Sequence, residues 1–163
     1  MEFSIQFSDH SGKLALAIDE VDEKTILDET ETEGFMPCKI FEVNLKREAK
    51  GNSTPFSAFS DISGILFGFL DSNPDAIIYF YCDDFNPVPY SRHGCRPQEY
   101  RSMLFSMLFD KEVSRRGCTG FVNERHVFKL ERPEGDAIFH LIFRRDMQRQ
   151  ADILRGAIDK LNK

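Results

Sequence analysis

The residues whose types and spacing could do chemistry are gathered in one polar segment near the middle of the chain. Two acids directly follow an apolar run and basic side chains come after them: Asp83, Asp84, Arg92, His93, Arg96 and Arg101. Carboxylates can bind a metal or accept a proton, and arginine donates paired N–H bonds to phosphate or carboxylate. Open α/β sheets bind ligands at the C-terminal ends of their strands, where these acids would emerge. The six residues therefore form the candidate ligand-binding site of a phosphate-directed enzyme or a small-anion binder.

The same segment also has a purely structural interpretation. It holds Pro87, Pro89, Gly94 and Pro97, and a polar loop of this kind uses its acids for turn hydrogen bonds and its arginines for ion pairs. The chain contains no phosphate-loop, dinucleotide-binding or nucleophile-elbow pattern. We therefore favour a non-enzymatic protein-binding or regulatory module and assign no catalytic residue, with the anion-directed function as the alternative.

The cysteines do not have the spacing of a metal site or a disulfide framework. Cys82, Cys95 and Cys118 could be combined with His93 as zinc ligands, but the close ligand pairs typical of zinc sites are absent. A nucleophilic pair of Cys95 and His93 is disfavoured because side chains two residues apart seldom face each other. The sequence thus predicts no metal and no cofactor, and it predicts reduced thiols.

Composition indicates one globular domain over residues 1–163. A chain of 163 residues with 41% apolar and 29% charged residues can bury a large core without a metal or disulfide. The N-terminal residues do not resemble a signal peptide, and the longest apolar runs are much shorter than a membrane span. These patterns favour a cytoplasmic location away from the membrane.

Charge is distributed unevenly along the chain. Residues 19–34 hold eight acids against Lys24, whereas residues 92–163 hold fifteen Lys or Arg against ten Asp or Glu. We interpret the acidic stretch as a solvated connection or strand edge. The basic excess is diluted by acids and has no accompanying aromatic motif, so nucleic-acid binding is not favoured. A protein partner or a homodimer remains the expected interaction.

Periodic patterns predict an α+β fold with the order β-β-β-α-β-α-β-β-α and a mixed or antiparallel sheet. Alternating residues predict a first hairpin over residues 3–18 and a third strand over 41–45. A helical stripe follows Pro55, with Ser53 or Thr54 as its cap, and Gly64 and Gly68 are expected to permit close approach of another element. The run of residues 77–82 is apolar throughout, which is typical of a strand covered on both faces.

The second half of the chain predicts a helix, a hairpin and a final helix. The second helix begins at Pro97 and ends before Gly117, with apolar positions that include Leu104, Met107 and Leu108. The second hairpin turns at residues 132–136, and His126 and His140 could meet across it. The last helix, capped by Asp146, has an apolar stripe that we expect to cover the chain's own sheet: Met147, Ala151, Leu154, Ile158 and Leu161.

Four features of the C-terminal half carry a family resemblance. They are the run IIYFYCDD, the arginine-bearing loop after it, the aromatic helix YRSMLFSMLFD and the late hairpin strand. In these features the chain resembles a family of small uncharacterised proteins from Bacteroides-type bacteria. The resemblance implies a layout, an N-terminal β-meander followed by alternating helices and strands, and no catalytic residue.

Overall fold

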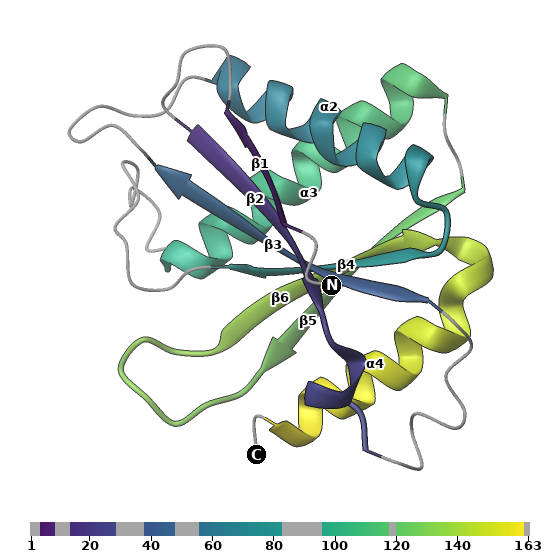
Figure 1. The fold of residues 1–163 in the computed structure, drawn as a ribbon. Helices are drawn as coiled ribbons and strands as arrows, with labels where there is room; N and C mark the ends of the chain where they lie inside the picture. The colour runs from purple at the N-terminus through teal and green to yellow at the C-terminus, as the bar shows by residue number, and fades with distance from the viewer. Residues whose placement is uncertain are drawn as a thin grey trace.

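The structure, a computed structural model, describes residues 4–8, 14–28, 38–47, 56–82, 96–117 and 120–161. Its elements follow one another in the order predicted from the sequence (Figure 1). They are β1 (Ser4–Ser8), β2 (Leu14–Val21), the short 3₁₀ helix η1 (Glu23–Thr25), β3 (Lys39–Arg47), α2 (Phe56–Ser72), β4 (Ala76–Cys82), α3 (Pro97–Arg116), β5 (Phe121–Phe128), β6 (Ala137–Arg144), the 3₁₀ helix η2 (Arg145–Met147) and α4 (Gln148–Leu161).

The six strands in the described ranges belong to one mixed sheet with the order β1-β2-β3-β4-β6-β5. β3 and β4 are parallel and are joined through α2, whereas the other neighbouring pairs are antiparallel. A parallel pair needs a crossover connection, and the helix between β3 and β4 supplies it. The α+β class is confirmed, and of the two expected kinds of sheet the mixed one is present.

The sheet separates two hydrophobic cores. α2 and α3 lie on one face and α4 lies on the other (Figure 1). The first core joins Ile78 and Ile142 of the sheet to side chains such as Phe67 and Phe109 of the two helices. The second core joins Ile77 and other strand residues to α4. Strands near the middle of the sheet therefore need apolar side chains on both faces.

β4 shows this double burial and confirms the prediction for the apolar run. Its even-numbered residues, including Ile78 and Phe80, pack toward α2 and α3, while Ile77 packs toward α4. β6 behaves in the same way, because residues 137–143 are all buried. The place of β6 between β4 and β5 explains this burial.

α3 has the ends expected from its sequence. Pro97 opens the helix, and the Glu99 carboxylate accepts a hydrogen bond of 3.2 Å from the Arg96 backbone N–H. Gly117 ends it at φ 66°, the left-handed conformation that favours glycine. Of the apolar positions noted in the sequence, Leu108 is buried, but Met107 is exposed. The expectation for Met107 is thus wrong, because this side chain lies on the outer face of α3.

The register of the second hairpin corrects the expectation for its histidines. His126 lies opposite Phe139, whereas His140 lies opposite Arg125. Because successive residues of a strand point to opposite faces, His126 lies on the α4 face of the sheet and His140 lies on the α3 face. They do not meet. Gly135 adopts φ 84° in the connecting turn, as predicted for a left-handed position.

α4 confirms most of the predicted stripe. Ala151 and Leu154 are fully buried, and Met147 and Ile158 are nearly so. Leu161 is 61% exposed, so its place in the covered stripe was wrong: the helix ends there, beyond the second core. Asp146 lies inside the 3₁₀ turn of residues 145–147, directly before α4, so its role as the cap of that helix stays a prediction.

The glycines of α2 do not mediate a close approach among the described residues. A Cβ atom added at Gly64 or Gly68 would meet no other atom within 4 Å. The Gly64 carbonyl instead accepts a hydrogen bond from Arg116 of α3. The expected caps Ser53 and Thr54 lie outside the described residues.

The acidic stretch begins inside β2, since Asp19 and Glu20 belong to that strand. Asp22 then organises η1, because its carboxylate accepts a hydrogen bond from the Lys24 backbone N–H at 3.0 Å. Asp28 lies 3.6 Å from the Lys160 ammonium group of α4. Residues 29–34 lie outside the described residues. The described part of the acidic stretch thus contains the end of β2 and the short helical turn η1.

Candidate functional site

The structure describes two of the six residues of the predicted site. Asp83, Asp84, Arg92 and His93 lie outside the described residues. Arg96 holds the β5–β6 turn, since its Nη1 donates to the Pro133 carbonyl at 2.7 Å. The Arg96 side chain also fills the space beside Gly135, where an added Cβ would lie 2.8 Å from its Cδ. Arg96 is thus a structural anchor of the hairpin.

Arg101 has a different environment, at the C-terminal end of β4. Burial raises the pKa of the Cys82 thiol to about 12, and the charges of Arg101 and Arg125 act against this shift. Both guanidinium groups therefore lie close enough to Cys82 to act on it electrostatically. Arg125 was not among the predicted residues. The end of β4, where ligand binding was expected, thus carries positive charge from α3 and from β5.

A chain of hydrogen-bonded side chains lies beside this end of β4. The Ser102 hydroxyl of α3 is 2.8 Å from His140 Nε2, and His140 Nδ1 is 2.7 Å from the Asn123 amide oxygen. Arg125 Nε donates to Ser102 Oγ at 2.9 Å, and Asn123 donates to Ser106 Oγ at 3.3 Å. We name this group the relay: Ser102, Ser106, Asn123, Arg125 and His140.

The donors and acceptors of the relay fix the state of His140. Asn123 Oδ1 can only accept, so the proton of the neutral imidazole lies on Nδ1. Nε2 is then a bare acceptor and takes the hydroxyl proton of Ser102. The Ser102 oxygen in turn accepts from Arg125 Nε, so both ring nitrogens of His140 and the Ser102 hydroxyl group have partners. The relay is therefore satisfied with a neutral histidine.

Burial keeps His140 neutral. Its side chain is 0% exposed, and the Phe105 ring of α3 lies 5.2 Å from the imidazole while the Phe80 ring of β4 lies 6.4 Å away. Burial lowers the pKa of His140 to about 4, and the positive charge of Arg125 acts in the same direction. His140 is thus a hydrogen-bonding core residue at neutral pH.

Ser102, His140 and Asn123 have the order of a nucleophile, a base and a group that orients the base. Their accessibility does not suit that chemistry. Ser102 is 1% exposed, and its oxygen already accepts a hydrogen bond from Arg125. A base with a pKa near 4 is also poorly matched to proton transfer at neutral pH. The geometry therefore favours a role in positioning α3 over nucleophilic catalysis.

The outer face of α3 carries an apolar strip. Met103 is 59% exposed and Met107 is 51% exposed, and they lie on successive turns of the helix. Tyr100 and Leu104 beside them are half-buried. Residues three and four apart are neighbours on a helix surface, so these four side chains are contiguous. We name them the outer strip.

The C-terminal half of α3 is fixed to α2. Arg116 donates to the Glu112 carboxylate at 3.1 Å, to Asp71 at 3.3 Å and to the Gly64 carbonyl at 3.2 Å. Its guanidinium group also lies over the Phe67 ring, 5.5 Å from the centroid. α3, which carries the outer strip, is therefore held on its inner side in both halves. The relay holds the N-terminal half, and Arg116 holds the C-terminal half.

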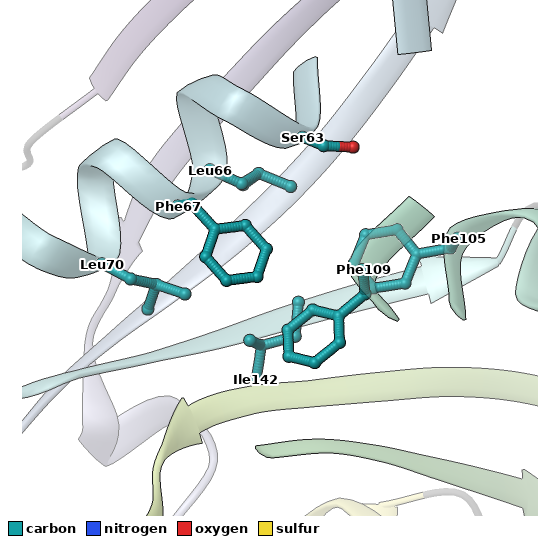
Figure 2. Close-up of a pocket in the computed structure, with 7 residues that line it drawn as sticks. All are labelled: Ser63, Leu66, Phe67, Leu70, Phe105, Phe109 and Ile142. Atoms are coloured by element: carbon teal, nitrogen blue, oxygen red, sulfur yellow. The ribbon is translucent and has the colours of Figure 1, made fainter. Parts of the chain in front are cut away.

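A small cavity lies between α2, α3 and β6. Figure 2 shows the side chains of the two helices facing each other across it, with Ile142 at its floor. Its volume is about 10 Å³, which is about the space that one water molecule needs. Its lining is apolar apart from Ser63: Ser63, Leu66, Phe67, Leu70, Phe105, Phe109 and Ile142. This cavity is too small for an organic substrate.

The residues that were considered and disfavoured as zinc ligands can be placed only in part. Cys82 is a buried free thiol, and Cys95, Cys118 and His93 lie outside the described residues. Within the ranges that the structure describes, no three His, Cys, Asp or Glu side chains are grouped as metal ligands. None of the described helices has the length and apolar character needed to cross a membrane.

Sequence reasoning missed the relay because its members come from three separate elements. One signal was available: Gln98, Ser102 and Ser106 recur every fourth residue of α3, which marks a polar stripe on one helix face. The partners of that stripe depend on the register of β5 against β6 and on the position of β6 in the sheet. Neither can be read from local periodicity.

Comparisons of the chain with protein-family models, with curated proteins and with solved structures give no match. The resemblance to the Bacteroides-type family therefore stays a prediction, and function has to be argued from the geometry of α3 and the relay.

Proposed function

We propose that the chain is a non-enzymatic protein-binding module that docks a partner protein on the outer strip of α3. The observation that carries the proposal is the exposure of Met103 and Met107 on successive turns of one helix. Methionine side chains are flexible and polarisable and adapt to the shape of a partner. Methionine and aromatic residues are enriched in the buried centres of interfaces. A cytoplasmic location, as expected from the sequence, belongs to the same proposal.

The way α3 is held supports this proposal. The relay fixes the inner face of its N-terminal half, and Arg116 fixes its C-terminal half to α2. A docking helix that is already rigid loses little conformational entropy on binding. Exposed Glu99, Asp110 and Lys111 surround the strip, and a polar rim around an apolar centre is the usual composition of an interface.

Photo-crosslinking through methionine tests the proposal. The chain has five methionines: Met1, Met36, Met103, Met107 and Met147. Met147 is buried, so a photoreactive methionine analogue places probes directly in the outer strip. We expect a discrete crosslinked partner in a lysate of the source cells, and a lower yield in the double variant Met103→Gln/Met107→Gln. Glutamine preserves length and helix propensity.

The control variant is Leu161→Gln, which changes an exposed apolar residue of α4 on the other side of the sheet. It should leave the crosslinked partner unchanged. Sedimentation velocity on the purified chain identifies a second copy as the partner if the wild-type protein dimerises and the double variant does not. Crosslinks that persist in the double variant would show that Met1, Met36 or Met147 carries them and that the outer strip is not the docking face.

A small-anion binder or phosphate-directed enzyme is the second candidate. It is favoured by the positive charge that Arg101 and Arg125 bring to the end of β4. If the chain binds small anions, millimolar phosphate should raise the thermal unfolding midpoint of the wild-type chain, because a ligand that binds only the folded state stabilises it. Arg125→Gln should remove the effect, whereas Arg149→Gln, which changes an exposed residue of α4, should retain it. An equal response of the wild type and Arg125→Gln would remove this candidate.

A further inference from the structure

The inner face of the N-terminal half of α3 is held by polar contacts rather than by apolar packing alone. Gln98 donates to the carbonyls of Glu134 and Asp136 at 2.7 and 2.8 Å. One turn later Ser102 contacts His140, and another turn later Ser106 contacts Asn123. Each contact joins α3 to the β5–β6 hairpin. The strength of this seam therefore depends on the hydrogen-bonding state of its central histidine.

Protonation of His140 removes the acceptor on which the seam depends. An imidazolium donates from both nitrogens, so Nε2 no longer accepts the Ser102 hydroxyl proton. Ser102 Oγ would then receive N–H groups from both His140 and Arg125, and its own proton would need a new acceptor. Two positive groups would share one buried oxygen. Such an arrangement is costly because Ser102 and His140 are both buried, although Arg125 itself reaches solvent.

The groups around His140 offer the imidazolium no compensating charge. Arg125 of β5 faces it and is positive, and Cys82 of β4 is neutral because burial raises its pKa. Arg101 of α3 adds positive charge near Cys82. His126, on the opposite face of the sheet, also acts electrostatically against protonation of His140. Among the described groups that act on His140, none is a carboxylate.

The C-terminal half of α3 lacks this sensitivity. Phe109 and the half-buried Val113 pack into the first core, as Phe105 does in the N-terminal half, and Arg116 ties the C-terminal half to Asp71 and Gly64 of α2. These contacts do not include a histidine. A charge on His140 thus weakens one half of the helix and spares the other.

We propose that the relay is an acid-sensitive latch, in which neutral His140 holds residues 97–106 of α3 against the β5–β6 hairpin and protonation of His140 releases them. At acid pH the released state is favoured because the His140 imidazole can then be protonated in contact with water. It no longer shares the Ser102 oxygen with Arg125. The latch works whether or not the outer strip binds a partner, so this proposal and the proposed function fail separately.

Hydrogen exchange of backbone amides tests the latch in the intact chain. The measured quantity is the protection factor, which corrects for the intrinsic effect of pH on exchange. The pKa of His140 is about 4 in the closed state and 6.5 in the reference state, so protection of residues 100–106 should fall roughly tenfold per pH unit below about 6.5 and level off near 4. Protection in α4 should fall much less over the same range.

Two substitutions provide the matched comparison. His140→Gln keeps one acceptor and one donor but cannot be protonated, so it should flatten the pH dependence of protection in residues 100–106. His126→Gln changes the histidine on the other face of the sheet and should leave the wild-type dependence intact. The latch would be overturned if His140→Gln kept the full pH dependence, or if α3 and α4 lost protection together, because the latter is global unfolding.

A third variant keeps the test decisive if His140→Gln does not fold. Arg125→Gln removes the positive charge beside His140, which raises the pKa of the closed state toward 6.5 and narrows the interval over which protection falls. The expected result is a smaller total loss of protection between pH 7 and pH 4 than in the wild type. An equal or larger loss would contradict the latch.

Discussion

At the scale of single residues, the environment of a side chain decides its chemistry more than its type does. His140 and His126 lie on the same hairpin, yet one is enclosed by the relay and the other faces α4. The sequence shows both as histidines on strands and offers no way to separate them. Burial and the neighbouring arginine make His140 a neutral hydrogen-bonding group.

A pH titration of stability follows from the pKa of His140. The unfolded chain protonates this histidine near pH 6.5, but the folded chain does so only near pH 4, so the unfolded state binds more protons between these values. The contribution of His140 to the free energy of unfolding is therefore complete above pH 6.5 and is lost as the pH falls toward 4, by up to about 3 kcal/mol.

Urea unfolding at a series of pH values measures this loss. Carboxylates also titrate near pH 4, so the informative quantity is the difference between the wild type and His140→Gln. We expect the wild type to lose more free energy of unfolding than the variant between pH 7 and pH 4.5. Parallel curves for the two proteins would show that His140 is protonated as easily in the folded chain as in the unfolded one.

Two glycines, Gly135 in a turn and Gly68 in a helix, give a second test at the scale of single residues. Gly135 has φ 84°, and an added Cβ would lie 2.8 Å from the Arg96 side chain, so Gly135→Ala should lower the free energy of unfolding by about 1–3 kcal/mol. Gly68 lies inside a helix and has open space around it, so Gly68→Ala should raise it by up to about 1 kcal/mol. Chemical denaturation of both variants measures the signs, and a loss at Gly68 would show that another part of the chain approaches that helix.

At the scale of elements, local patterns predict type and position well. The alternation of the first strands, the apolar run of β4 and the stripe of α4 each correspond to an element within a few residues. These patterns succeed because the side-chain period directly reflects which faces are covered. Pattern reasoning fails for the orientation of α3, where Gln98 and Ser102 are buried and Met103 and Met107 are exposed. Its buried polar groups are tolerated only because partners from the hairpin satisfy them.

Leu154 provides the prediction at the element scale. Its side chain is 0% exposed in the second core, so Leu154→Ala should lower the free energy of unfolding by about 2–5 kcal/mol through lost transfer energy and a residual cavity. Thermal and urea unfolding measure this cost. Sedimentation provides the control, because a variant that is folded, stable and monomeric while the wild type is dimeric would mean that α4 is an intermolecular seam.

At the scale of the whole molecule, the arrangement of three layers depends on strand order. β6 lies between β4 and β5, which brings His140 beneath α3 and places Asn123 and Arg125 next to it. Strand order arises from contacts between distant parts of the sequence. The periodic patterns alone therefore could not decide between a mixed and an antiparallel sheet. For the same reason the sequence did not predict the relay: Arg101 beside it was named as a candidate site residue, whereas Ser102, Asn123 and Arg125 were not, and the role of Arg101 stays a prediction.

The central claim is that a neutral His140, protonated on Nδ1, joins α3 to the β5–β6 hairpin. Nitrogen-15 NMR of the imidazole in the full chain tests it most directly, because the two ring nitrogens report both the tautomer and the pKa. We predict a protonated Nδ1, an unprotonated Nε2 and a titration midpoint far below 6.5, near 4. Rapid averaging of both tautomers with a midpoint near 6.5 would mean that His140 is exposed to water, and it would contradict the relay.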